Sequence, residues 1–180
     1  FNTLNTIAEL IDTDPGRAGE MVARLGELLR KSLETDRPLI PLQAELDFVR
    51  LYTEIERVRF ESWLSVDHDV DRAALDAWVP PMILQPIVEN AIKHGISPSK
   101  RKGTITIRAL RADNRLKLEV QDDGVGVTAS NGSKGTGIGL ATTRERLSHL
   151  FGDQATLAVA SDNGNGTRVH LELPFITHPR

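Results

Sequence analysis

The sequence has no cysteine, no long apolar run and no excess of charge of one sign. Without cysteine, a disulfide framework, a thiolate-bound metal centre and a cysteine nucleophile are all excluded. No apolar run reaches the roughly 18 residues that a membrane span requires. The 22 basic and 25 acidic residues give a net charge of −3, which provides no general attraction to nucleic acid or to an anionic membrane surface.

What remains is ordinary for a globular protein. Hydrophobic residues make up 39% of the 180 residues and charged residues 26%, which are common proportions. The length suits one large domain, or a domain of ordinary size with an appendage. Because the sequence starts at Phe1, without a methionine or a signal-peptide pattern, we expect it to be a fragment of a longer protein.

The first third of the sequence predicts a helical hairpin. Apolar residues recur at helical spacing in two stripes, and Asp14 followed by Pro15 is typical of the start of a second helix. The stripes are Leu4, Ile7, Ala8 and Ile11, then Ala18, Met21, Val22, Leu25, Leu28, Leu29 and Leu33. So short a hairpin buries little apolar surface by itself. Its partner is either the rest of the same chain or a second copy in a dimeric bundle.

The remaining sequence mixes helices and strands. Pro38-Leu39-Ile40-Pro41 is expected to be extended, because proline disfavours a helix at the residue before it. This segment marks the expected boundary between a helical domain over 1–37 and a second domain over 38–180. Helices are expected over 43–60, 81–95 and 138–151, and strands over 63–70, 105–109, 116–120, 155–160 and 167–173.

The helix expected over 81–95 carries a concentrated set of polar side chains. Glu89 and Lys93 are four residues apart, as are Asn90 and His94, so each pair shares a helix face. Carboxylate and amide oxygens suit a hard cation, and the two basic groups suit phosphate oxygens. The pattern therefore indicates a magnesium–phosphate site, and a solvated polar face with an incidental Glu–Lys pair is the alternative.

Asp122 ends an expected strand and precedes Gly124 and Gly126. A carboxylate in this place can accept a hydrogen bond from an exocyclic amine at the edge of a pocket. The two glycines allow a flat ligand to approach the backbone. An ordinary Asp-Gly turn leaving a strand is the alternative.

A third segment, with glycines at 135, 137 and 139, opens the helix expected over 138–151. Free backbone N–H groups and the helix dipole favour phosphate there. Ile138 and Leu140 would anchor the helix in the core. The run lacks the lysine of a P-loop and does not directly follow a strand, as a dinucleotide fingerprint does. A mobile surface loop is the alternative.

Together the three segments resemble the ATP-binding superfamily of gyrase, the heat-shock chaperone, histidine kinases and mismatch-repair ATPases of the MutL kind. Thr167, after Gly166, fits the last motif of that superfamily. Two further stretches narrow the resemblance to LytS-type sensor histidine kinases: Phe1-Asn2-Thr3-Leu4-Asn5 and Leu84-Gln85-Pro86-Ile87-Val88-Glu89-Asn90-Ala91-Ile92-Lys93-His94-Gly95.

The resemblance implies an α+β fold, in which an N-terminal helical hairpin precedes a two-layer α/β sandwich of the Bergerat type. The sheet would be mixed, with helices on one face. The function implied is that of the cytoplasmic catalytic part of a sensor kinase, whose parent is anchored in the membrane upstream. It would transfer the γ-phosphate of ATP to a histidine before Phe1, and onward to a response regulator. A homodimer would form through the N-terminal helices.

The resemblance also implies roles for individual residues. Asn90 would hold Mg²⁺, and Glu89 would orient or deprotonate the attacking group or hold the metal through water. The remaining nucleotide contacts would come from Lys93, His94 and Gly95, from Asp122, Gly124, Gly126 and Thr167 around adenine, and from Gly135, Gly137, Ile138, Gly139 and Leu140 around the phosphates. Arg144 and Arg146 would either add positive charge at the phosphates or pair on the surface.

Two departures from the family pattern remain. Asp123 stands where the family usually has asparagine, and we expect the change to be tolerated at the rim of the site. The segment between Gly126 and Gly135 is short for a lid, and we expect it to move without ligand. Two other functions stay open: a conformational ATPase of the chaperone or mismatch-repair kind, and a non-catalytic nucleotide-binding module that regulates a partner.

Overall fold

A computed structural model describes residues 2–33, 37–60, 63–99, 101–126, 137–161 and 166–177. The lid segment over 127–134, Gly135 and the ends of the chain lie outside these ranges. Within them, no helix combines the length and the apolar character that crossing a membrane would need.

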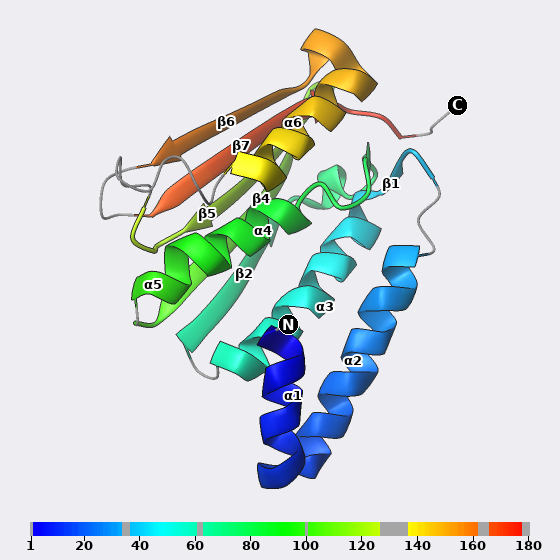
Figure 1. Cartoon of the computed structure of the whole chain (residues 1–180). Helices are drawn as coiled ribbons and strands as arrows, with labels where there is room; N and C mark the ends of the chain where they lie inside the picture. Colours follow the sequence, from blue (N-terminus) through cyan, green and yellow to red (C-terminus); the bar gives the residue numbers. More distant parts are fainter. Residues whose placement is uncertain are drawn as a thin grey trace.

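The N-terminal hairpin forms as predicted. Helices α1 (Asn2–Thr13) and α2 (Pro15–Leu33) are separated by Asp14, whose Oδ1 accepts a hydrogen bond from the N–H of Arg17 at 3.1 Å. This bond satisfies one of the free N–H groups at the start of α2. The hairpin packs on α3 (Leu42–Phe60) through a small cluster of Ile7, Met21 and Ile55 (Figure 1).

A mixed sheet of five strands forms the second part, in the order β2-β4-β5-β7-β6. Strand β2 runs parallel to β4, and the other neighbouring pairs are antiparallel. The strands are β2 (Leu64–Val70), β4 (Gly103–Ala112), β5 (Arg115–Asp122), β6 (Thr156–Ser161) and β7 (Thr167–Pro174). The hairpin turn between β4 and β5 uses Asp113 at φ 54°, a backbone region that aspartate tolerates better than most residues.

Helices cover one face of this sheet (Figure 1). They are α3, α4 (Gln85–Asn90) with the π-helix η3 (Ala91–Ile96) and α5 (Ser97–Ser99), and α6 (Gly137–Phe151). Alternate strand residues such as Ile105, Ile107 and Leu118 point into the core beneath them. The opposite face carries ion pairs, with Glu119 between Arg108 and His170. The expected two-layer α+β fold is confirmed.

The helix expected over 81–95 is the main difference from prediction. Pro81–Leu84 is a turn, and the helix begins only at Gln85, with Pro86 in its first turn, where proline is well tolerated. After Asn90 the helix widens into η3, in which the N–H of Ser97 bonds to the carbonyl of Ile92. The pattern of apolar residues indicated neither feature, because both depend on contacts with distant parts of the chain.

Smaller elements complete the fold. Strands β1 (Ile40–Pro41) and β3 (Trp78–Val79) pair in a separate antiparallel sheet, which agrees with the extended segment expected over 38–41. The 3₁₀ turns η2 (Arg72–Ala74) and η4 (Gly152–Gln154) connect longer elements.

Candidate functional site

Asp122 lies at the end of β5, directly opposite Thr167 in β7. Its side chain is only 3% exposed, and Oδ1 accepts a hydrogen bond from the N–H of Gly124 at 3.0 Å. Burial raises the pKa of the Asp122 carboxyl, while hydrogen bonds from the backbone of Gly124 and Thr167 oppose that rise. A buried carboxylate held by its own backbone is a fixed acceptor at the wall of the site.

Three glycines allow this arrangement. A Cβ at Gly95 would lie 2.3 Å from Oδ1 of Asp122, and one at Gly124 would lie 2.2 Å from the carbonyl of Gly95. Gly166 has a φ of +89°, and a Cβ there would lie 1.9 Å from the carbonyl oxygen of Asp122. The close approach brings the end of η3, the end of β5 and the start of β7 together. Gly166 is a site residue that the sequence predictions missed, although it directly precedes Thr167 in the last motif.

Asn90 and Gly139 meet at the other end of the site. A Cβ at Gly139 would lie 3.4 Å from Cβ of Pro86 and 3.8 Å from Nδ2 of Asn90. The first turn of α6 therefore lies against the asparagine helix α4. Nδ2 of Asn90 is buried and has no hydrogen-bond partner among the described residues, which is a costly state for an amide.

Glu89, beside Asn90, is held by one side chain of α4 and one of η3. Gln85 donates to Oε1 at 2.8 Å, and Nζ of Lys93 lies 3.0 Å from Oε2. The predicted shared face of Glu89 and Lys93 is thus confirmed, with Lys93 paired to the carboxylate. His94 is exposed.

Two polar side chains of α3, Tyr52 and Glu56, lie close enough to Glu89 to interact with its charge. Glu56 is buried and pairs with Arg59 at 2.6 Å. Burial raises the pKa of Glu56, and Arg59 and Lys93 oppose the rise. Burial also raises the pKa of Tyr52 in the same helix, and the negative charges of Glu56 and Glu89 raise it further. The tyrosine therefore stays protonated, and sequence reasoning gave it no place near the site.

Helix α6 begins at Gly137, close to its predicted start at 138, and the backbone of Gly137–Leu140 forms its first turn. Leu140 is 9% exposed and anchors this turn in the core, as expected. Gly126 follows β5 at a φ of +72°. The two arginines of α6 bond to backbone carbonyls: Arg144 to Leu157 at 3.5 Å and Arg146 to Pro81 at 2.5 Å.

Asp123 stays outside the pocket. Its side chain is exposed, Oδ1 accepts from the N–H of Thr104 at 2.7 Å, and its carbonyl accepts from Arg101 at 3.1 Å. The contact with Thr104 extends the pairing of β4 and β5 by one residue beyond Asp122. The rim position expected for this residue agrees with its exposure.

The residues present fit a magnesium–nucleotide group. Mg²⁺ is commonly bound through one or two protein oxygens together with substrate phosphates. The side chains of Glu89 and Asn90 carry adjacent oxygen ligands, and Nδ2 of Asn90 lies beside the start of α6, where backbone N–H groups favour phosphate.

Comparison with known proteins agrees with this geometry. Residues 1–64 match the family described as histidine kinase, and residues 81–177 match the family described as histidine kinase-, DNA gyrase B-, and HSP90-like ATPase. The sensor protein LytS of Staphylococcus saprophyticus is 35% identical over 97% of this chain. The sensor histidine kinase BtsS of Escherichia coli K12 is 36% identical over 97% of it. The chain spans 31% of the length of each of these relatives.

The fold has counterparts among solved structures. The histidine kinase domain of the blue-light activated kinase EL346 from Erythrobacter litoralis superposes with a TM-score of 0.59 and 21% identity, covering 88% of this chain and 74% of that one. The resemblance to LytS-type sensor kinases is thereby confirmed in sequence, and that to histidine kinase domains in fold. The match over residues 81–177, together with the arrangement of Asn90, Asp122 and the start of α6, shows that this chain belongs to the histidine kinase-, DNA gyrase B- and HSP90-like ATPase family.

Proposed function

We propose that this chain binds ATP with Mg²⁺ and is the catalytic part of a sensor histidine kinase, which transfers the γ-phosphate to a histidine. The single observation that carries the proposal is the convergence at Gly95. Its backbone contacts Asp122 and Gly124, and the helix that leads to it presents Asn90 to the first turn of α6. A base site and a phosphate site therefore lie along one element.

At the base end, Asp122 accepts a hydrogen bond from the exocyclic amine of adenine. The carboxyl is buried, and a ligand that donates a hydrogen bond to it would compensate an acceptor that has been removed from water. Thr167 supports the aspartate from β7, and Gly124 and Gly126 let the ring lie close to the backbone.

At the phosphate end, Asn90 holds the metal through its amide oxygen, and Glu89 orients the attacking group. Bound Mg²⁺ neutralises charge on the phosphate oxygens. Gly137, Ile138, Gly139 and Leu140 offer backbone N–H groups to the phosphates, together with Gly135, which lies outside the described residues. Lys93 and His94 add positive charge, and Lys93 leaves its partner Glu89 to do so. Positioning and charge neutralisation are the main requirements of phosphoryl transfer.

The hairpin supplies the dimer contact in this proposal. Its surface exposes a stripe of apolar side chains, each more than half exposed: Leu4, Ile11, Val22, Leu29 and Leu33. Leu4 and Ile11, like Val22 and Leu29, are seven residues apart, which places each pair on one helix face. A second copy of the hairpin would cover this stripe. The parent protein would be anchored in the membrane upstream and would pass the phosphate to a response regulator.

Calorimetry with a non-hydrolysable ATP analogue, with and without Mg²⁺, tests the binding step on this chain. Labelled ATP tests the transfer step on a longer protein that contains this sequence and its acceptor histidine. The proposal predicts magnesium-dependent binding and a labelled histidine. Binding without any labelled histidine would instead support a non-catalytic nucleotide-binding module, and absence of binding would remove the site.

A further inference from the structure

The turn Pro81–Leu84, which joins β3 to α4, has an unusual backbone. Met82 has a φ of 55°, in the left-handed region that side chains other than glycine, asparagine and aspartate rarely adopt. Such a conformation is strained and persists only where surrounding contacts enforce it. Two charged side chains from different helices supply these contacts.

Glu45 of α3 holds the turn from one side. Its side chain is 1% exposed, Oε2 accepts from the N–H of Met82, and Oε1 accepts from the N–H of Leu84, both at 2.8 Å. Burial raises the pKa of the Glu45 carboxyl, and these backbone hydrogen bonds oppose the rise. Both oxygens are committed to the two N–H groups that bracket Ile83.

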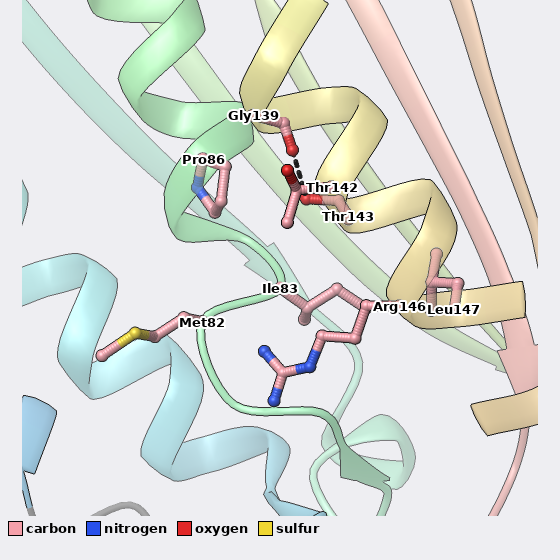
Figure 2. A pocket seen from close by; sticks show the side chains of 8 residues that line it. All are labelled: Met82, Ile83, Pro86, Gly139, Thr142, Thr143, Arg146 and Leu147. Atoms are coloured by element: carbon pink, nitrogen blue, oxygen red, sulfur yellow. Dashed lines mark hydrogen bonds between the residues drawn. The ribbon is translucent and has the colours of Figure 1, made fainter. Parts of the chain in front are cut away.

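Arg146 of α6 holds the same turn from the other side. Nη1 donates to the carbonyl of Pro81 at 2.5 Å. Figure 2 shows the guanidinium group reaching from α6 into the bend of the turn, while Met82 points away from it toward α3. Arg146 follows Gly139 by seven residues, about two helical turns, so both lie on the same face of α6. They line one groove of about 290 Å³ together with Ile83 and Pro86.

We propose that Glu45 and Arg146 are positioning residues, which clamp the turn Pro81–Leu84 and thereby hold the first turn of α6 in place beside Asn90. The proposal rests on the proposed function, because the geometry it protects is that of the phosphate end. Among the described residues, the side chain of Arg146 makes no hydrogen bond to Asn90 or to the first turn of α6. Its effect on them is therefore exerted through Pro81–Leu84.

The clamp also links the hairpin to the site. Helix α3 carries Glu45 near its start and Ile55, which packs on Ile7 and Met21 of the hairpin, near its end. A shift of α3 relative to the sheet would pull on Met82 and Leu84 through the hydrogen bonds that they donate to the Glu45 carboxylate. The turn Pro81–Leu84 is therefore one physical connection between α3, on which the hairpin packs, and the phosphate end.

The test compares Arg146→Met with Arg146→Lys and with Arg72→Met, an exposed arginine of η2 that serves as the matched control. For each variant, calorimetry gives the affinity for the magnesium complex of an ATP analogue, and hydrogen exchange gives the protection of the α6 amides without ligand. We expect Arg146→Met to weaken binding about tenfold and to speed α6 exchange, as the loss of a charged hydrogen bond predicts. Arg146→Lys should retain most of the affinity and most of the α6 protection, and Arg72→Met should change neither the affinity nor the protection.

Glu45→Gln supplies a second, independent variant, because it keeps the shape of the side chain and replaces one acceptor oxygen by a donor. We expect weaker binding of the same analogue and faster exchange in α4 and α6. If the parent chain binds the analogue and Arg146→Met binds it equally with unchanged α6 exchange, the clamp is overturned and the proposed function stands. If the parent chain does not bind the analogue, the proposed function fails and the role of the clamp fails with it.

Discussion

Asp122 and Asn90 lie at opposite ends of the candidate site, and their surroundings differ. Asp122 is enclosed by backbone: Gly95, Gly124 and Gly166 leave no room for a side chain, and Gly124 donates to the carboxylate. Asn90 is partly exposed, but its amide nitrogen is buried and has no partner among the described residues. At the base end closely packed main chain fixes the Asp122 carboxylate, whereas the proposed metal position at the other end depends on the side chain of Asn90.

The difference separates two ways of damaging the site. Substitutions of the base-end glycines disturb packing and so affect folding as well as binding. Changes at the phosphate end remove a group that contributes little to folding, and so affect binding alone. The following predictions test this distinction, from the largest expected effect to the smallest.

Gly166→Ala is expected to have the largest effect on stability. Its Cβ would lie 1.9 Å from the carbonyl oxygen of Asp122, at a φ that disfavours alanine, so the free energy of unfolding should fall by about 3 kcal/mol or more. Denaturant unfolding measures this change. Gly26→Ala is the matched control: nothing lies within 4 Å of its Cβ position, and alanine within a helix should stabilise by roughly 0.5–1 kcal/mol. Equal effects of the two substitutions would contradict the packing argument.

Asn90→Ala should abolish magnesium-dependent nucleotide binding while leaving the fold nearly unchanged. The substitution removes an amide whose buried nitrogen has no partner among the described residues, so few contacts are lost. We expect the free energy of unfolding to change by less than about 1 kcal/mol. Calorimetry and denaturant unfolding on the same sample check both halves. A large loss of stability, with nucleotide binding retained, would reverse the roles assigned to the two ends.

Asp122→Asn should weaken adenine binding by roughly 1–3 kcal/mol, the cost of losing a hydrogen bond in a buried site. Stability near neutral pH should be kept or slightly raised, because the substitution removes a carboxylate whose charged form is disfavoured by burial. Asp153→Asn, at an exposed position of η4, is the control and should leave both quantities unchanged.

The smallest expected effect is the pH dependence of stability that arises from the Asp122 carboxyl. Because its folded pKa is raised above the ordinary value of 3.8, the folded protein binds the proton more tightly than the unfolded chain. Its contribution to stability is therefore present below pH 3.8 and is lost as pH rises through the folded pKa. Nucleotide affinity should change in the opposite direction and fall as the pH drops through the same range, because protonation removes the carboxylate acceptor. The difference between the parent chain and Asp122→Asn, measured across pH, isolates this contribution from that of Glu45, which titrates with the same sign.

The sequence predicted the parts of the fold whose pattern is local. Alternation at Ile105, Ile107 and Ala109 predicted β4, because side chains of a strand point to opposite faces in turn. Helical spacing likewise predicted the hairpin. Asp122 and Asn90 were both recognised as candidate site residues from motifs.

Features that depend on distant contacts were not predicted. The turn Pro81–Leu84 reads as part of an apolar helix, and its conformation depends on Glu45, which lies 37 residues before Met82. The widening of the helix into η3 accompanies the contact of Gly95 with Gly124, whose own position is set by β5. Nothing in the residues around Glu45 indicates that its carboxylate accepts hydrogen bonds from a distant turn.

Backbone amide resonances during titration with the magnesium complex of an ATP analogue test the central claim most directly. The account predicts that the amides of Gly124, Gly139 and Thr167 all shift, with one common dissociation constant, because the three segments that carry them enclose a single ligand. Shifts confined to one of these segments, or different constants for the base end and the phosphate end, would contradict it.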